Sequence, residues 1–70
     1  MSNEATVRNW QAAIIDDCAS ILKRQLTRSE TMFIRSRAGF MALEMIHDHV
    51  RGLTGKPDEL QTYLRSESDE

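Results

Sequence analysis

The sequence predicts an all-α protein, built as an antiparallel helical hairpin of two long helices with a short C-terminal helix. Three observations support this fold class. The 70 residues include only one proline and three glycines, and Gly39 is the sole helix-weakening residue between Ser2 and Arg51. Apolar residues recur at helical spacing along most of the chain. A helix-start motif at residues 27–30 divides the chain into two long segments.

The first helix is expected over residues 4–26. At about 100° per residue, its apolar side chains fall within one stripe roughly 160° wide, which is typical of a helix that faces a core. Two glutamines lie inside this stripe. Its members are Val7, Trp10, Gln11, Ile14, Ile15, Cys18, Ile21, Leu22, Gln25 and Leu26.

The second helix is expected over residues 28–52. Thr27 and Glu30 have the spacing of a capping box, in which each side chain satisfies a free backbone amide at a helix start. Gly52 followed by Leu53 is typical of a C-terminal cap with its accompanying apolar contact.

One continuous helix over residues 2–51 is the alternative, because the expected turn contains neither glycine nor proline. The first apolar stripe, continued in the same phase, meets Ser36 and His47. Four apolar residues of the second segment lie on the opposite side: Ile34, Ala38, Met41 and Met45. This change of phase favours the hairpin.

A third, short helix is expected over residues 57–65. Pro57 is tolerated in the first turn of a helix, and the two acidic residues that follow it favour the positive end of the helix dipole. Residues 1–65 are therefore predicted to form a single helical domain. The acidic tail, residues 66–70, is predicted to be disordered.

Cysteine usage and charge bound the class of protein. Cys18 is the only cysteine, which rules out an internal disulfide and fits a reducing compartment. The first twenty residues include four charged side chains and resemble neither a signal peptide nor a membrane span. We therefore expect a cytoplasmic protein without membrane contact. A domain of this size buries only about 60% of its unfolded surface, so a metal or a partner is expected to stabilise it.

The second predicted helix has more apolar surface than the remaining segments can cover, and a helix that is apolar around most of its girth is buried on more than one side. The sequence predicts a homodimer in which two hairpins form a four-helix bundle. A monomeric three-helix bundle and a different protein partner are the alternatives. The expected interface residues are Trp10, Phe33, Phe40, Met41, Leu43, Met45 and Ile46.

Basic residues concentrate between positions 23 and 37, where Glu30 is the only acid, although the chain as a whole has a formal charge of −2. The expected hairpin brings this segment to one end of the molecule, where it could meet RNA or DNA phosphates. A solvated helical end is the simpler interpretation. The candidate nucleic-acid contacts are Lys23, Arg24, Arg28, Arg35 and Arg37.

Glu44 and His47 have the Glu-x-x-His spacing of ligands in ferritin-like metal-binding bundles. However, Glu44 shares its helical face with other charged residues, and the first helix has no carboxylate within its apolar stripe. A solvated charged strip is therefore favoured over a metal site.

No arrangement of residues predicts catalysis. Cys18 has no histidine or basic residue one helical turn away, as an activated thiol requires. We expect a small non-enzymatic interaction module, an adaptor or regulator, that acts as a homodimer, binds another protein and needs no cofactor. A dimeric RNA- or DNA-binding regulator and a metal-binding bundle are the second and third hypotheses.

Overall fold

Four helices make up residues 3–68, the part of the chain that the computed structural model describes. No strand occurs in this part, so the predicted all-α class is confirmed. None of the described helices is both long and apolar enough to cross a membrane. The helices are α1 (Asn3–Leu22), α2 (Arg28–Arg35), α3 (Phe40–Gly52) and α4 (Pro57–Ser68).

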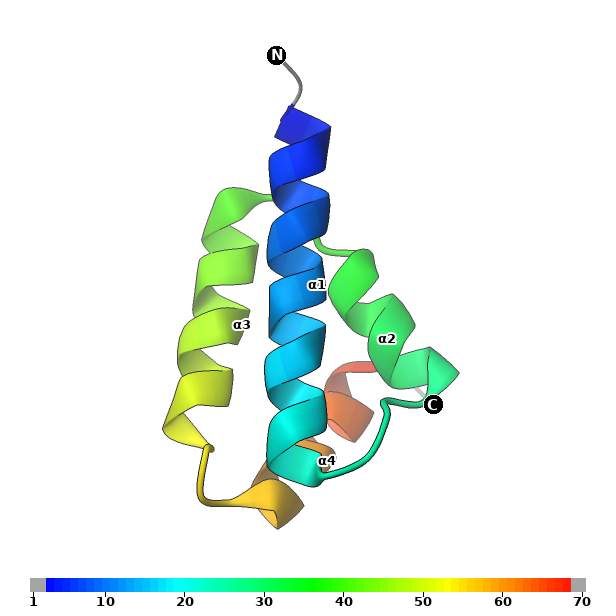
Figure 1. Ribbon diagram of the computed structural model, residues 1–70, viewed down its shortest axis with the longest axis vertical. Coiled ribbons are helices and arrows are strands. Elements are labelled where there is room, and N and C mark those ends of the chain that lie inside the picture. The colour runs from blue at the N-terminus through cyan, green and yellow to red at the C-terminus, as the bar shows by residue number, and fades with distance from the viewer. Residues whose placement is uncertain (1–2, 69–70) are drawn as a thin grey trace.

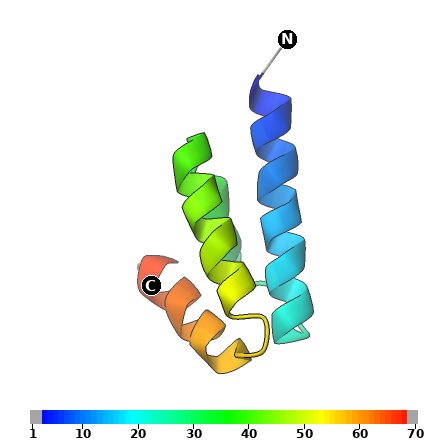
Figure 2. The ribbon, with the colours of Figure 1, turned by 90° about the vertical axis from the view of Figure 1, so that its left-hand side faces the viewer.

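The chain reverses direction after α1 and again after α2 (Figure 1). As a result α2 runs antiparallel to α1, whereas α3 runs beside α1 in the same direction (Figure 1). α4 begins below the end of α3 and turns back up, where it packs against α2 and α1 (Figure 2). α1 is therefore the central helix, in contact with the three others.

The structure corrects the second predicted helix, because residues 28–52 form two helices and not one. The Ser36 hydroxyl donates a hydrogen bond of 2.7 Å to the carbonyl oxygen of Phe33 at the end of α2. Gly39 then adopts an extended conformation as the N-cap of α3. Serine competes for backbone hydrogen bonds and glycine weakens a helix, so the break occurs where the segment is least helical by preference.

Gln11 of α1 holds this break in place. Its side chain is buried, and its amide nitrogen donates to the carbonyl oxygens of Arg35, at 3.1 Å, and of Arg37. The carbonyl groups at a helix C-terminus have no partner within the helix. A glutamine inside the apolar stripe of α1 therefore anchors the connection between α2 and α3.

The ends of α1 and α4 also differ from the prediction. α1 ends at Leu22, four residues before the predicted end, because Lys23 takes a left-handed conformation with φ of 59°. The amides of Lys23 and Arg24 both donate to the carbonyl oxygen of Ala19, which closes the helix without a glycine. α4 continues to Ser68, so residues 66–68 of the predicted disordered tail are helical. Residues 69–70 lie outside the described part.

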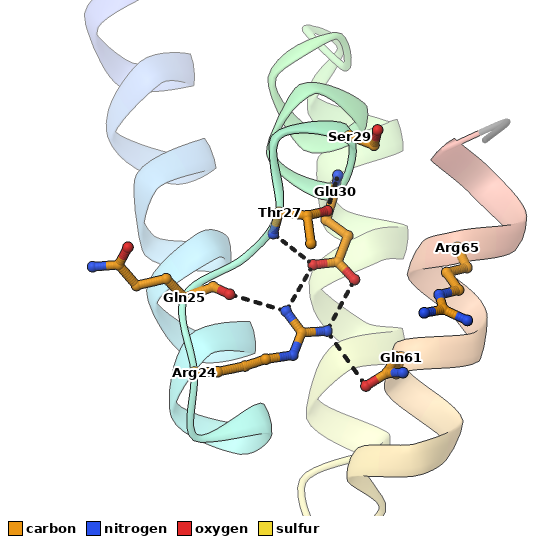
Figure 3. A pocket seen from close by; sticks show the side chains of 7 residues that line it. All are labelled: Arg24, Gln25, Thr27, Ser29, Glu30, Gln61 and Arg65. Atoms are coloured by element: carbon orange, nitrogen blue, oxygen red, sulfur yellow. Dashed lines mark hydrogen bonds and ion pairs between the residues drawn. The ribbon is translucent and has the colours of Figure 1, made fainter.

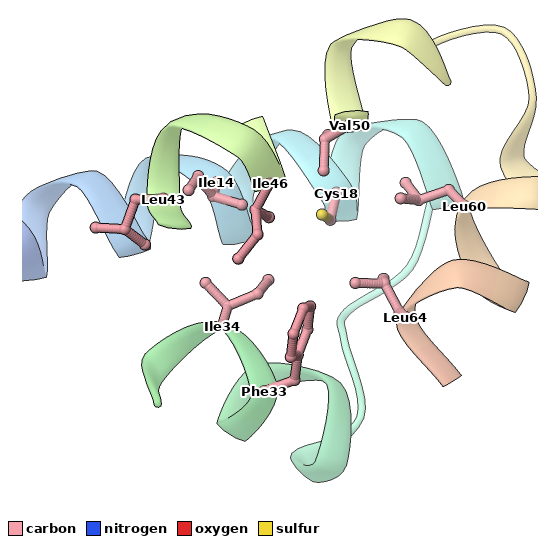
Figure 4. Packing of buried hydrophobic residues seen from close by; sticks show 9 residues of the cluster. All are labelled: Ile14, Cys18, Phe33, Ile34, Leu43, Ile46, Val50, Leu60 and Leu64. Carbon is pink, nitrogen blue, oxygen red and sulfur yellow. The ribbon is translucent and has the colours of Figure 1, made fainter. Parts of the chain in front are cut away.

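A single apolar core lies between the helices (Figure 4). All four helices contribute to it, and the Cys18 thiol lies inside it. Part of the apolar surplus of residues 28–52 is thus buried within one protomer. The buried core residues are Ile14, Cys18, Phe33, Ile34, Leu43, Ile46, Val50, Leu60 and Leu64.

Candidate interaction surface

The solvent-facing side of α3 carries large apolar side chains. Met41 and Met45, one turn apart, are 77% and 68% exposed, and Phe40 at the start of the helix is 46% exposed. Single exposed apolar residues are common on protein surfaces, but neighbouring ones form a patch typical of interaction sites. These three residues are named the α3 patch. The opposite side of the helix is filled by Leu43, Ile46 and Val50.

The structure divides the seven predicted interface residues into two groups. Phe33, Leu43 and Ile46 lie in the core of a single protomer, because α1 packs against α3, and α1 and α4 pack against α2. Trp10 is half-buried between the core and the surface. The α3 patch is exposed, so it is the part of the predicted interface that a partner can reach.

Trp10 connects the α3 patch to α1. Its ring lies 6.0 Å from the ring of Phe40, centroid to centroid, and its Nε1 donates a hydrogen bond of 3.1 Å to Nδ1 of His47. The other ring nitrogen of His47, Nε2, lies 3.0 Å from Oδ2 of Asp17. Because Nδ1 accepts a hydrogen bond, we assign His47 as the neutral ring with its proton on Nε2, which donates to Asp17.

Charged residues border the α3 patch. Glu44, Asp48 and Arg51 are exposed on α3, and Arg37 is exposed in the connection before it. The Arg37 guanidinium lies 5.0 Å from the ring centroid of Phe33, a cation–π contact with α2. An apolar centre with a charged border is the usual composition of a protein interface.

The basic residues do not gather at one end of the molecule. Lys23 follows α1 and Arg28 begins α2, both exposed, whereas Arg35 lies at the opposite end of α2, about 10 Å away along the helix axis. Arg24 is paired with Glu30, and Arg37 lies over Phe33. The length of α2 and these two contacts thus keep the basic residues from forming one positively charged end.

Arg24 and Glu30 form the centre of a polar junction, defined as Arg24, Thr27, Glu30 and Gln61 (Figure 3). Glu30 is only 3% exposed, and its two carboxylate oxygens accept from the two terminal nitrogens of Arg24, each at 3.1 Å. Glu30 also accepts from the Thr27 amide at 2.9 Å, and its own amide donates to the Thr27 hydroxyl at 3.2 Å. The predicted capping box is confirmed.

The hydrogen bonds from Arg24 lower the pKa of Glu30, against the opposing effect of burial, and the Thr27 amide lowers it further. The same interaction raises the pKa of Arg24. Both groups therefore stay charged and neutralise each other. The junction residues line a pocket of about 650 Å³ together with Gln25, Ser29 and Arg65, and two of its charged side chains, Arg24 and Glu30, are paired with each other. The junction joins α2 to α4 through the 3.4 Å contact between Arg24 and Gln61.

The residues singled out for a metal site or a reactive thiol are engaged otherwise. Among the described residues, no group of three or more histidine, cysteine or acidic side chains could hold a metal ion. Glu44 is exposed, and both ring nitrogens of His47 have protein partners. Burial raises the pKa of the Cys18 thiol to about 12, with Asp17 and Glu30 adding to the effect, so the thiol stays protonated at neutral pH.

Comparisons with known proteins give no family assignment. No family model matches the chain, and no curated protein or solved structure is significantly similar to it.

Proposed function

We propose that this chain is a small non-enzymatic helical interaction module, an adaptor or regulator, that pairs with a second copy of itself through the α3 patch. The observation that carries the proposal is the exposure of Met41 and Met45 one turn apart beside Phe40. Methionine side chains are flexible and polarisable, and they are frequent at protein contacts together with aromatic residues. The single free cysteine supports a reducing cytoplasm as the location.

The distribution of charge favours a second copy as the partner. A two-fold axis makes the contact self-complementary, so that each residue pairs twice. If the exposed sides of the two α3 helices pack antiparallel and cross at the level of Leu43 along the helix axis, Met41 faces the partner's Met45. The same arrangement brings Arg37 close to the partner's Asp48, which gives two symmetric ion pairs at the border of the patch.

The size of the surface limits the strength of the dimer. α3 has 13 residues and is therefore about 20 Å long. A contact made mainly by one such helix lies at the low end of specific interfaces, so we expect a Kd in the micromolar range or weaker. The α1–α3 pairs of the two copies would then form a four-helix arrangement. α2 and α4 would face outward and be free to contact another protein.

Sedimentation equilibrium of the wild-type chain and of the double variant Met41→Glu/Met45→Glu tests the proposal. We expect a monomer–dimer equilibrium for the wild type and a monomer of unchanged helix content for the variant. Met32→Glu is the matched control, because Met32 is also exposed, at 58%, but lies on α2 outside the patch. A wild-type chain that stays monomeric at millimolar concentration contradicts the proposal. So does a dimer that persists in the double variant, or one that is lost in the control alone.

A further inference from the structure

We propose that His47 makes dimerisation through the α3 patch dependent on pH, because it holds Trp10 beside Phe40 only while its ring is neutral. This inference rests on the proposed function, since dimerisation is the property that is regulated. The partner surface does not include His47 itself, which lies on the side of α3 that faces α1.

A continuous chain of contacts joins the titrating group to the patch. It runs from Asp17 to His47 at 3.0 Å, from His47 to the indole nitrogen of Trp10 at 3.1 Å, and from Trp10 to the ring of Phe40 at 6.0 Å between centroids. The His47 side chain is 18% exposed, so solvent protons can reach it although most of the ring is covered. Trp10 is held from one side by His47 and touches the patch on the other.

Protonation changes only one of the two hydrogen bonds of His47. The added proton binds to Nδ1, which then becomes a donor and faces the indole N–H of Trp10, also a donor, so this hydrogen bond is lost. The bond from Nε2 to Asp17 remains and gains charge assistance. Since Asp17 fixes the ring, Trp10 is the group that moves, and Phe40 loses its ordered neighbour at the edge of the patch.

The surrounding charges accept a protonated ring. α1 is the helix with the main contacts to α3, and it contributes the carboxylate of Asp17. On α3 itself, Glu44 lies one turn before His47 and Asp48 follows it, whereas Arg51 lies one turn after it. Acids outnumber bases around the ring. The main unfavourable change on protonation is therefore the loss of the hydrogen bond with Trp10, and not a repulsion between charges.

Trp10 is the only tryptophan of the chain, so its indole N–H gives a single reporter resonance in NMR spectra. We would follow it from about pH 8 to about pH 5, the interval in which histidine changes charge. His47→Asn is the matched variant, because the asparagine Oδ1 can accept the indole hydrogen bond but does not titrate. We expect the resonance to shift with pH in the wild type and to stay constant in His47→Asn.

Sedimentation equilibrium at both ends of this interval measures the coupling to dimerisation. We expect the dimer Kd to rise at acid pH by no more than roughly 10-fold, because the hydrogen bond is lost in monomer and dimer alike and only its effect on the order of Phe40 reaches the interface. In His47→Asn the Kd should change less with pH. The change that remains in this variant comes from the other titrating groups, and it is subtracted from the wild-type change.

The outcomes separate the switch from the dimer. An indole resonance that does not move with pH, or that moves equally in His47→Asn, overturns the switch. A resonance that titrates in the wild type alone while the Kd stays constant overturns its coupling to dimerisation. If the chain is monomeric at every pH, the proposed function fails and the coupling fails with it. The NMR titration then still decides whether His47 holds Trp10.

Discussion

In most proteins charged side chains are exposed and large apolar side chains are buried. The polar junction departs from the first rule and the α3 patch from the second. At the junction a glutamate is almost completely buried, and at the patch two methionines are among the most exposed apolar side chains of the described residues. The difference lies in the partners. Both carboxylate oxygens of Glu30 find donors inside the protomer, whereas Met41 and Met45 are left uncovered by the described residues.

The polar junction supports the fold of one protomer, whereas we propose that the α3 patch serves assembly. A buried charge with a complete set of hydrogen bonds supports the arrangement of the helices that surround it. Exposed apolar surface contributes nothing to the stability of one copy, and it becomes useful only when something covers it. Substitutions should therefore lower the free energy of unfolding at the junction and in the core, and change dimerisation alone at the α3 patch.

Substitutions on the two sides of α3 should differ most. Leu43 is fully buried and Met41 is 77% exposed, although they are two positions apart on one helix. We expect Leu43→Ala to lower the free energy of unfolding by about 3 kcal/mol, and Met41→Ala by no more than about 0.5 kcal/mol. Urea unfolding followed by circular dichroism measures both at a protein concentration well below the Kd of the proposed dimer, where only the monomer contributes. Similar losses would contradict the assignment of the two faces.

Glu30→Gln should produce the next largest loss. The substitution removes the charge that pairs with Arg24 and weakens the capping box, so we expect the free energy of unfolding to fall by about 2 kcal/mol. This value is below that of fully buried pairs, because the Arg24 side chain is 35% exposed. Glu44→Gln on the exposed side of α3 is the control and should change stability by less than about 0.5 kcal/mol. An equally mild effect of both variants would show that the junction is not structural.

The contribution of Glu30 should also depend on pH. Its folded-state pKa is lowered, so the carboxylate stabilises the fold above the unfolded-state value of about 4.3. This stabilisation is lost as the pH falls through the folded-state pKa. Urea unfolding of the wild type and of Glu30→Gln at pH 7 and at about pH 3 should therefore show a difference that becomes smaller in acid. A constant difference would mean that packing, and not charge, explains the loss.

The sequence predicts the local features of this molecule well. The all-α class and the capping box at residues 27–30 follow from local composition and spacing, which determine helix formation and helix starts directly. The excess of apolar surface on residues 28–52 is also visible in the sequence. Its division into a buried and an exposed side is not, because that depends on where the remaining helices pack.

The break at residues 36–39 is the main feature that the sequence analysis missed, and two signals pointed to it. Gly39 was the only weak point in a long helical stretch, and Gln11 was a polar residue inside an apolar stripe. Both signals belong to one contact, between the Gln11 side chain and the carbonyl groups of Arg35 at the end of α2 and Arg37 in the connection, which lie 24 and 26 residues away in the sequence. Likewise, the chain from Asp17 through His47 to Trp10 depends on α3 running parallel to α1, which spacing within one helix cannot reveal.

The smallest expected effect is a change in the dimer Kd from substitutions at the border of the α3 patch. It tests whether the partner is a second copy in the antiparallel orientation. If Arg37 pairs with the partner's Asp48, Arg37→Asp and Asp48→Arg should each weaken the dimer by about 0.5 to 1 kcal/mol, or roughly 2- to 5-fold in Kd. The double variant should recover most of this loss, because the reversed charges attract again. Urea unfolding of each variant controls for the loss of the Arg37 contact with Phe33 inside the protomer. Additive losses in the double variant would contradict the antiparallel crossing, and the patch would then bind a second copy in another orientation or a different protein.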